Sequence, residues 1–296
     1  MNILIAGGTG FLGSTLADRL AADGHKVFIL TRRKPSAPNH FQWDGIRNSG
    51  WTPIVNEVDA VLNLTGLSTA HWPWTKKRKR QFVDSRVLPG HALASAIGSA
   101  IRRPRVFLQV SGINHYGLRG DSVADESTPP ADDFLAQLTV QWEESTRPLE
   151  ELGVRRVVLR SAVVLDKQRG LFPLMVLPVR LFFGGRFGNG LQAFPWIHIE
   201  DYARAARFLL EDENARGPFN LISPELTSNA EFMRETCKAL ARPYWFHLPE
   251  SLLRLTLGEM SVMLVDGRFA RPNHLLEMGF KFNYGDLSGA LKNLFA

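Results

Sequence analysis

The sequence predicts an α/β fold, with an open, doubly wound parallel sheet followed by a smaller C-terminal α+β lobe. Three observations predict it. Apolar, strand-like runs alternate with helical segments up to Leu165, glycines at regular spacing separate the first run from the first helix, and glycine and proline become frequent after Leu165. Alternation of this kind produces parallel strands that are joined by right-handed helical crossovers.

Five apolar runs have the length and composition of buried parallel strands. They are Asn2 to Ala6, Val27 to Leu30, Val61 to Leu64, Val106 to Val110 and Val157 to Leu159. Leucines at helical spacing from Leu12 to Leu20 predict a helix that ends near Gly24. Further helices are predicted over residues 75–101, 133–152 and 201–210.

The domain boundary is expected after Leu165, because glycines and prolines crowd residues 170–190 and interrupt any regular α/β unit. We assign residues 1–165 to a nucleotide-binding domain, to which residues 201–215 return. Residues 166–200 and 216–296 are assigned to the substrate lobe. His198, between two isoleucines, is expected on a strand.

Length and composition are those of an ordinary globular protein. The chain has 296 residues, 45% of them hydrophobic, and 35 Lys and Arg against 29 Asp and Glu give a formal net charge of +6. This mild positive charge favours small anionic ligands without requiring nucleic acid. The single cysteine, Cys237, excludes an internal disulfide, and the histidines never come at ligand spacing, so we expect no metal.

Nothing in the sequence predicts a membrane segment. The N-terminal residues lack the basic segment of a signal peptide. The longest apolar stretch, Leu171 to Phe183, is interrupted by prolines and an arginine and is too short to span a bilayer. We therefore expect a cytoplasmic protein without membrane contact. The apolar stretch either covers a substrate or packs against the other lobe, and the sequence carries no signal for the oligomeric state.

Three glycines, Gly7, Gly10 and Gly13, follow the first strand and open the first helix. They provide a tight turn, close approach of the backbone to a diphosphate and close packing of helix on strand. The helix N-terminus directs free N–H groups and a favourable dipole at phosphates. The predicted dinucleotide site of this Rossmann-type domain consists of Gly7, Thr9, Gly10, Phe11, Leu12 and Gly13.

The second strand ends in Thr31, Arg32 and Arg33, where NAD-binding sheets place an acid that holds the ribose hydroxyls. No acidic residue follows before Asp44. Two guanidiniums that can fork onto a phosphate suit the 2′-phosphate of NADP. We therefore expect NADP(H) as the cofactor. The alternative is that both arginines are solvated loop residues.

The segment from Gly7 to Gly13 resembles the extended short-chain dehydrogenase/reductase superfamily, which includes nucleotide-sugar epimerases and dehydratases. Other segments narrow the resemblance to the epimerase family proteins, which carry a C-terminal domain of unknown function. These segments include Asn63 to Gly66, Ser85-Arg86, Ser111 to Gly117, Trp142-Glu143, Trp196 to Asp201, Gly217 to Asn220, Leu248-Pro249 and Arg271-Pro272. The resemblance implies a Rossmann-type domain, a C-terminal substrate lobe and a cleft between them.

By this resemblance, Leu64, Thr65 and Gly66 line the adenosine side of the cofactor, and Ser161 and Ala162 approach the nicotinamide. The chain departs from the superfamily at its catalytic pair, a Tyr followed four residues later by a Lys that lowers the tyrosine pKa. The residues four beyond the chain's four tyrosines are Gly120, Ala206, Leu248 and Ser288, and Leu135 and Thr139 stand near the expected position of the pair. The standard mechanism therefore cannot be transferred.

Ser111 and Tyr116 remain as candidate catalytic residues. Ser111 follows a predicted strand and should lie at the carboxyl edge of the sheet, beside the nicotinamide. Without a lysine partner, Tyr116 should keep a pKa of about 10 and give a proton more readily than it accepts one. This asymmetry favours reduction of a carbonyl over epimerisation. The alternative is that Ser111 satisfies the strand end and Tyr116 packs under the loop.

Lys79, Arg86 and His198 are the candidate substrate residues. Lys79 and Arg86 lie two turns apart on a predicted helix and would bind an anionic group, whereas His198 is either a polar group at the cleft or a core histidine. The basic run at residues 76–80 lacks interleaved aromatics, so we expect a solvated helix face and no nucleic acid. Asp121 belongs to an acidic loop that is either a cleft rim or solvated.

Two functions are consistent with these features. One is an NADP-dependent oxidoreductase or epimerase-like enzyme with nonstandard catalytic residues, which reduces a small carbonyl or sugar-like substrate. The other is a noncatalytic NADP(H)-binding sensor or regulatory protein. The missing Tyr/Lys pair favours the sensor, and Ser111 together with a complete substrate lobe favours the enzyme.

Overall fold

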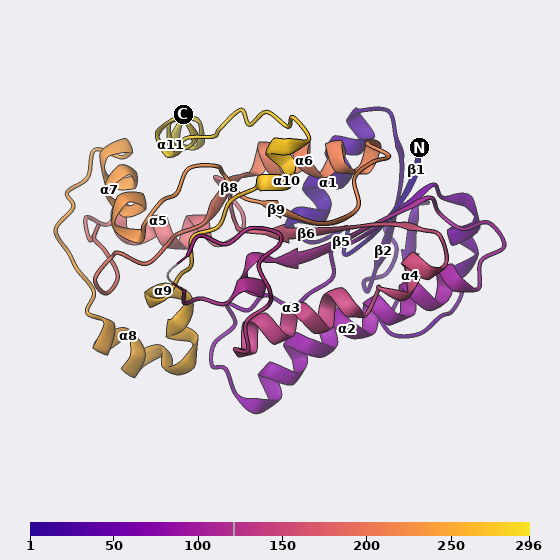
Figure 1. Cartoon of the computed structure of the whole chain (residues 1–296), viewed down its shortest axis with the longest axis horizontal. Helices are drawn as coiled ribbons and strands as arrows, with labels where there is room; N and C mark the ends of the chain where they lie inside the picture. The colour runs from indigo at the N-terminus through magenta and orange to yellow at the C-terminus, as the bar shows by residue number, and fades with distance from the viewer. Residues whose placement is uncertain (121) are drawn as a thin grey trace.

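A seven-stranded parallel sheet forms the centre of the computed structural model, which describes residues 1–120 and 122–296 (Figure 1). The strands are β1 (Asn2–Ala6), β2 (Lys26–Thr31), β3 (His40–Gln42), β4 (Ala60–Asn63), β5 (Val106–Gly112), β6 (Arg155–Ser161) and β9 (Gly217–Leu221). Their order, β3-β2-β1-β4-β5-β6-β9, confirms the predicted doubly wound α/β fold. Asp121 of the acidic loop lies outside the described residues.

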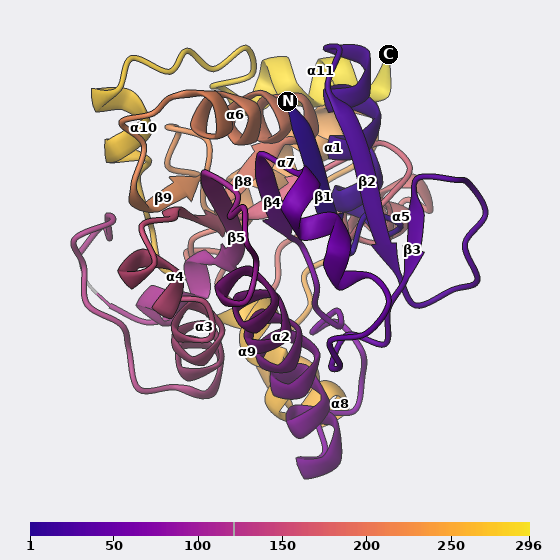
Figure 2. The same cartoon turned by 90° about the vertical axis from the view of Figure 1, so that its right-hand side faces the viewer.

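Helices cover both faces of the sheet, as Figure 2 shows. They are α1 (Phe11–Ala22), α2 (Lys76–Gly98), α3 (Phe134–Glu144), α4 (Pro148–Glu151) and α6 (Ile199–Glu211), with the short 3-10 helices η1 (Thr52–Glu57) and η2 (Ile113–Tyr116). Successive strand residues point to opposite faces. In β1, Ile3 and Ile5 join the core under α1 and α6, whereas Leu4 and Ala6 join the core under α2.

The edge strand β9 corrects the expected domain boundary, which placed residues 216–296 in the substrate lobe. It pairs with β6 in the main sheet, where Val158 lies opposite Pro218 and Leu159 opposite Phe219. Pro218 has no N–H to donate, and proline within sheets is confined mainly to edge strands and bulges. Gly217 and Pro218 are therefore compatible with a strand at this edge.

The predicted helix over residues 133–152 is also divided. Residues 145–147 separate α3 from α4, and Pro148 is the first residue of α4. Proline lacks the N–H that a continuing helix would use, but it is well suited to a first helical position. The break therefore follows from Pro148, whose effect the apolar periodicity of the sequence does not show.

The C-terminal lobe has its own apolar core, which includes Phe172, Trp196 and Phe232. Its elements are α5 (Phe172–Arg180), the two-stranded sheet of β7 (Val163–Leu165) and β8 (Trp196–His198), α7 (Asn229–Ala239), α8 (Glu250–Leu257), η3 (Gly258–Ser261), α9 (Val262–Val265) and α11 (Leu287–Phe295). The short helix α10 (Asn273–Glu277) packs instead against β9, and its Leu275 joins the core of the main sheet. Cys237 is buried in the core of the lobe, and burial raises the pKa of its thiol.

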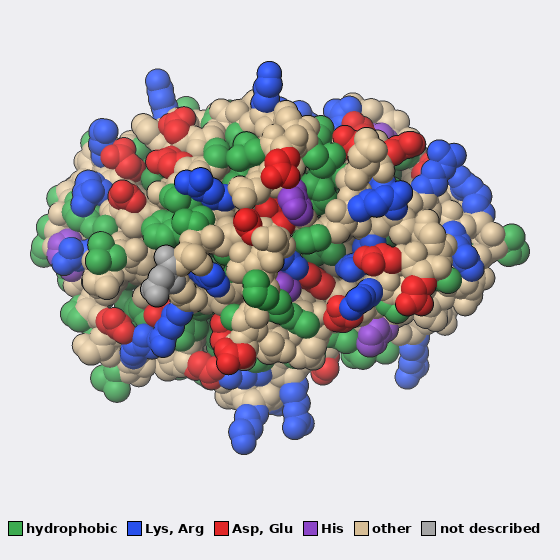
Figure 3. Space-filling model, in the orientation of Figure 1, with side chains coloured by type: hydrophobic (Ala, Val, Ile, Leu, Met, Phe, Trp, Pro, Cys, Tyr) green, Lys and Arg blue, Asp and Glu red, His purple; other side chains and the backbone are tan. Residues whose placement is uncertain are grey.

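The surface carries both signs of charge, which are interspersed over the face shown in Figure 3. Within the described part of the chain, no helix combines the length and the apolar character that a membrane crossing needs. The basic run at residues 76–80 forms the first turns of α2, where Lys76, Lys77 and Arg80 are exposed.

Candidate functional site

A closely packed glycine loop joins β1 to α1. Gly7 has a φ of 81°, a conformation that favours glycine. A Cβ at Gly13 would lie 2.2 Å from the carbonyl oxygen of Gly7, and a Cβ at Gly7 would lie 2.8 Å from the carbonyl oxygen of Leu64. Thr9 and Gly10 are exposed at the start of α1, whose first N–H groups have no partner within the helix. This cradle fits a dinucleotide diphosphate.

The two arginines after β2 are exposed. Thr31 is buried, and its hydroxyl accepts a hydrogen bond of 3.1 Å from the backbone N–H of Arg33. In the part of the chain that the structure describes, neither guanidinium forms a hydrogen bond or an ion pair. Both side chains are therefore free to take an anionic ligand at the end of β2.

The segment after β4 is held by a buried amide. Asn63 accepts hydrogen bonds from the backbone N–H and the hydroxyl of Thr65, at 3.2 and 2.7 Å, and donates one of 3.0 Å to Gln109. Leu64 donates its N–H to Ala6. This bonding fixes Leu64, Thr65 and Gly66 beside the glycine loop, at the position that the resemblance implies for cofactor contacts.

A cleft of about 330 Å³ opens between the glycine loop and the C-terminal lobe. It is lined by Phe11 and Leu12 from α1, Ile113 and Asn114 from η2, Ser161 and Ala162 after β6, and Met263, Asp266, Gly267 and Arg268 from the lobe, among others. The structure thus brings four of the expected cofactor residues to one cavity. Leu171 also lines it, whereas Leu174 and Leu177 of the same apolar stretch are exposed.

Asn114, Asp266 and Arg268 are polar residues that line this cleft. Arg268 is committed to the loop, because its guanidinium donates to the carbonyl oxygens of Tyr116 and Ser122 and to the Ser122 hydroxyl. Asp266 accepts a hydrogen bond of 3.1 Å from Arg119. Asn114 is half-buried, and its amide forms no hydrogen bond within the described residues.

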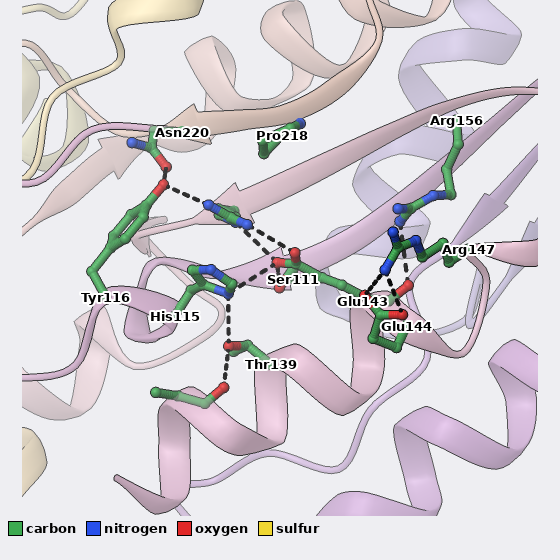
Figure 4. Close-up of polar contacts among 12 residues, drawn as sticks. Ser111, His115, Tyr116, Thr139, Glu143, Glu144, Arg147, Arg156, Pro218 and Asn220 are labelled. Carbon is green, nitrogen blue, oxygen red and sulfur yellow. Dashed lines mark hydrogen bonds and ion pairs between the residues drawn. The ribbon is translucent and has the colours of Figure 1, made fainter. Parts of the chain in front are cut away.

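A buried polar network lies between α3 and the ends of β5 and β6 (Figure 4). Arg160 donates two hydrogen bonds to the carboxylate of Glu143, at 3.0 and 2.9 Å, and the Ser111 hydroxyl donates a third of 2.7 Å. Burial alone would raise the pKa of Glu143, but the hydrogen bonds and charge of Arg160 hold it below its ordinary value. Glu143 is therefore ionised at neutral pH.

Tyr116 belongs to the same network rather than to the cleft. Its hydroxyl donates to the amide oxygen of Asn220 at 2.7 Å and accepts from Arg160 at 3.0 Å. Only 1% of Tyr116 and 3% of Ser111 are exposed, and burial raises the pKa of Tyr116 to about 12. We expected the hydroxyls of Ser111 and Tyr116 to face a substrate. The structure corrects this expectation, because both hydroxyls are buried and already form hydrogen bonds with other side chains of the protein.

Leu135 and Thr139, near the expected position of the missing catalytic pair, are buried on α3. The Thr139 hydroxyl donates to the carbonyl oxygen of Ala136 at 2.7 Å and lies 3.5 Å from Nδ1 of His115. Burial lowers the pKa of His115 to about 4, although Glu143 lies nearby at 3.7 Å. His115 is therefore neutral at physiological pH.

The structure separates Lys79 from Arg86, which we expected to share an anionic ligand. Lys79 forms an ion pair with Glu259 of η3, and its ammonium lies 4.6 Å from the Phe134 ring centre. Arg86 is buried, with a guanidinium 4.8 Å from the Trp142 ring centre. Lys79 therefore joins α2 to the C-terminal lobe, whereas Arg86 packs against Trp142 of α3.

His198 lies in the protein core, and β8 confirms the strand expected around it. Its Nδ1 accepts a hydrogen bond of 3.2 Å from the backbone N–H of Glu200 and so caps α6. Its ring centre lies 3.9 Å from that of Tyr284, and burial lowers its pKa. This geometry supports the core-histidine interpretation and corrects the candidate substrate role.

Sequence reasoning missed Asn114, Glu143 and Arg160 as parts of the site. One signal was available for Arg160, which is a charged residue directly after the apolar run from Val157 to Leu159. Glu143 stands in a segment that carried the family resemblance, but a lone helical glutamate is usually solvated. Only the fold shows that this charge is buried against Arg160.

The glycine loop and the strand order define a Rossmann-type dinucleotide-binding domain with an appended lobe. Residues 3–221 match the NAD dependent epimerase/dehydratase family, and residues 248–294 match a domain of unknown function (DUF1731). The chain belongs to the NAD dependent epimerase/dehydratase family, as the resemblance implied.

Curated relatives match over the whole chain. The epimerase family protein YfhF of Bacillus subtilis is 34% identical over 303 residues, which cover 100% of this chain and 98% of the Bacillus protein. The epimerase family protein SDR39U1 of Bos taurus is 36% identical over 301 residues and covers 100% of both chains.

Solved structures agree with this assignment. The crystal structure of human SDR39U1 (isoform 2) with NADPH has a TM-score of 0.91 at 32% identity and covers 99% of both chains. The nucleoside-diphosphate sugar epimerase of Corynebacterium glutamicum has a TM-score of 0.81 at 26% identity, over 98% of this chain and 57% of that chain. A UDP-glucuronic acid 4-epimerase from Bacillus cereus with UDP-glucuronic acid and NAD shares the fold, with a TM-score of 0.78 over 99% and 97% of the chains at 16% identity.

Proposed function

We propose that this chain binds NADPH and uses it to reduce a small carbonyl compound. The observation that carries the proposal is the continuity of the cleft, which begins at Phe11 and Leu12 of α1, next to the glycine loop, and reaches Asn114 and the C-terminal lobe. The exposed Arg32 and Arg33, together with the NADPH in the crystals of human SDR39U1, support the choice of cofactor. When bound, NADPH supplies a hydride.

Different residues of this chain would bind different parts of the cofactor. The N–H groups at the start of α1 would hold the diphosphate, and Arg32 and Arg33 would hold the 2′-phosphate. Ser161 and Ala162 would lie against the nicotinamide end, since they line the cleft at the carboxyl edge of the sheet.

The reaction class follows from the polar groups of the cleft. The Asn114 amide can donate a hydrogen bond to a carbonyl oxygen and so favour charge on that oxygen. Epimerisation would also need a base, and the acid that lines the cleft among the described residues, Asp266, is paired with Arg119. These groups suit reduction, with water as the source of the proton.

The first test compares the affinities for NADPH and NADH by fluorescence titration. The wild type should bind NADPH more tightly, and an Arg32→Ala/Arg33→Ala variant should lose about 1.5–3 kcal/mol per charge-assisted hydrogen bond on NADPH only. Equal wild-type affinities would contradict the cofactor assignment. Consumption of NADPH with a panel of small aldehydes and ketones then tests the reaction. Asn114→Ala should slow the consumption of NADPH, and epimerisation of UDP-sugars by the wild type would refute the proposed reduction.

A second candidate function is noncatalytic sensing of NADP(H). The enclosure of Ser111 and Tyr116 favours it, because no tyrosine hydroxyl lines the cleft in the described part of the chain. Tight NADPH binding without NADPH consumption across the carbonyl panel would select this alternative.

A further inference from the structure

Arg86 on α2 is a buried cation without a carboxylate partner among the described residues. It is 9% exposed, and its Nη1 donates to the carbonyl oxygen of Phe82 at 3.0 Å and to the Ser85 hydroxyl at 3.4 Å. By contrast, the buried Arg160 is paired with Glu143. A buried charge without a counter-charge is costly, so Arg86 is an unusual residue for a purely structural position.

The guanidinium of Arg86 packs closely against Trp142 and Gly66. Its Cζ lies 4.8 Å from the Trp142 ring centre. A Cβ at Gly66 would lie 3.2 Å from Cζ and 3.4 Å from both Nε and Nη2. Nε and Nη2 have no acceptor within the described residues. A planar cation is thus held in place while part of its donor edge remains unused.

The position of Arg86 relates it to the glycine loop rather than to the substrate. Gly66 follows Leu64 and Thr65, whose backbone atoms lie against Gly7: a Cβ at Gly7 would be 2.8 and 3.2 Å from them. Arg86 does not line the cleft that contains Asn114. These contacts lead from Arg86 through Gly66 to the glycine loop. The anion nearest to Arg86 would therefore be the diphosphate that this loop accommodates.

We propose that Arg86 is a binding residue for the cofactor diphosphate, to which Nε and Nη2 donate from the β4 side of the glycine loop. The proposal rests on the proposed NADPH binding and replaces the expected role of Arg86 in holding a substrate anion. A guanidinium is suited to this task because its donors form a planar fork that matches phosphate oxygens.

Two fragments of the cofactor distinguish the binding role of Arg86 from that of Arg32 and Arg33. ADP-ribose contains the diphosphate without the 2′-phosphate, and 2′-AMP contains the 2′-phosphate without the diphosphate. Arg86→Met should weaken ADP-ribose, NADH and NADPH alike, roughly 10-fold or more, and leave 2′-AMP unchanged. Arg32→Ala/Arg33→Ala should weaken 2′-AMP and NADPH and leave ADP-ribose unchanged. Calorimetric titration of the full chain measures all four ligands.

Controls separate a binding role from a structural one. Arg80→Met removes an exposed positive charge from the same helix and should leave ADP-ribose affinity unchanged. The melting temperature of ligand-free Arg86→Met should stay near that of the wild type, since no ion pair is lost. Arg86→Lys, which keeps the charge but not the fork, should bind ADP-ribose with intermediate affinity and serves if the Met variant does not fold.

The outcomes are distinct. Unchanged ADP-ribose affinity in Arg86→Met and Arg86→Lys would overturn the assignment of Arg86 while leaving NADPH binding intact. A wild type that binds neither NADPH nor ADP-ribose would instead refute the proposed function itself.

Discussion

Replacing Glu143 by Gln should destabilise the protein strongly, because the carboxylate is the counter-charge of a buried arginine. The side chains of Glu143 and Arg160 are 11% and 7% exposed, and two hydrogen bonds of 2.9 and 3.0 Å join them. Removing one charge of a buried pair costs about 3–5 kcal/mol. Gln keeps the shape and can still accept a hydrogen bond from Ser111, so we expect the free energy of unfolding to fall by about 3 kcal/mol.

Urea unfolding at pH 7 measures this loss, and the chain contains a matched control. Glu144, the next residue of α3, pairs with Arg147 at 3.1 Å, but these side chains are 54% and 64% exposed. An exposed pair contributes at most about 1 kcal/mol, so Glu144→Gln should change the stability little. A Glu143→Gln/Arg160→Met double variant should lose less than the sum of the single losses, since no unpaired cation remains.

The pH dependence gives an independent check. The pKa of Glu143 is lower in the folded state than its ordinary value of 4.5. Its contribution to stability is therefore present above pH 4.5 and is lost as the pH falls through the lower, folded value. Glu143→Gln should remove this part of the acid dependence. If Glu143→Gln is as stable as Glu144→Gln, the buried ion pair of Glu143 and Arg160 does not stabilise the fold.

Two further predictions concern His115 and the glycine loop. Burial lowers the pKa of His115 from 6.5 to about 4, so the unfolded chain takes up a proton first and stability should fall by about 3 kcal/mol as the pH drops across this range. Urea unfolding at several pH values should show this slope in the wild type and not in His115→Asn. Gly13→Ala places a Cβ 2.2 Å from the Gly7 carbonyl oxygen, so it should cost about 1–3 kcal/mol and abolish NADPH binding. Gly50→Ala is the control, because nothing lies within 4 Å of the added Cβ. Normal NADPH binding by Gly13→Ala would contradict the assignment of the glycine loop as the diphosphate-binding site.

The parts of the fold that the sequence predicted are those determined by local patterns. The run from Asn2 to Ala6 and the leucines of α1 flank a glycine motif, and each feature can be recognised within a few residues. The edge strand β9 could not be recognised in this way, because Pro218 lowers its strand character and only its place beside β6 makes the proline acceptable.

The buried network could not be predicted from local patterns at all. Glu143 and Arg160 lie 17 residues apart, on a helix and on a strand, and a charged side chain is solvated in most proteins. The sequence therefore favoured a solvated environment for each residue separately. Their burial is tolerable only as a pair, and pairing is a property of the tertiary structure.

The misplacement of Ser111 has a specific geometric cause. Strand residues alternate between the two faces of a sheet, and in β5 Leu108 and Val110 join the core under α1 and α6, whereas Phe107 joins the core under α2. Ser111 has the parity of Phe107, so its hydroxyl points towards α3 and Glu143. Because β5 is buried on both faces, its sequence does not alternate between apolar and polar residues and does not show which parity faces α3. The group that reaches the cleft is instead Asn114, three residues further on, where η2 has ended the alternation of the strand.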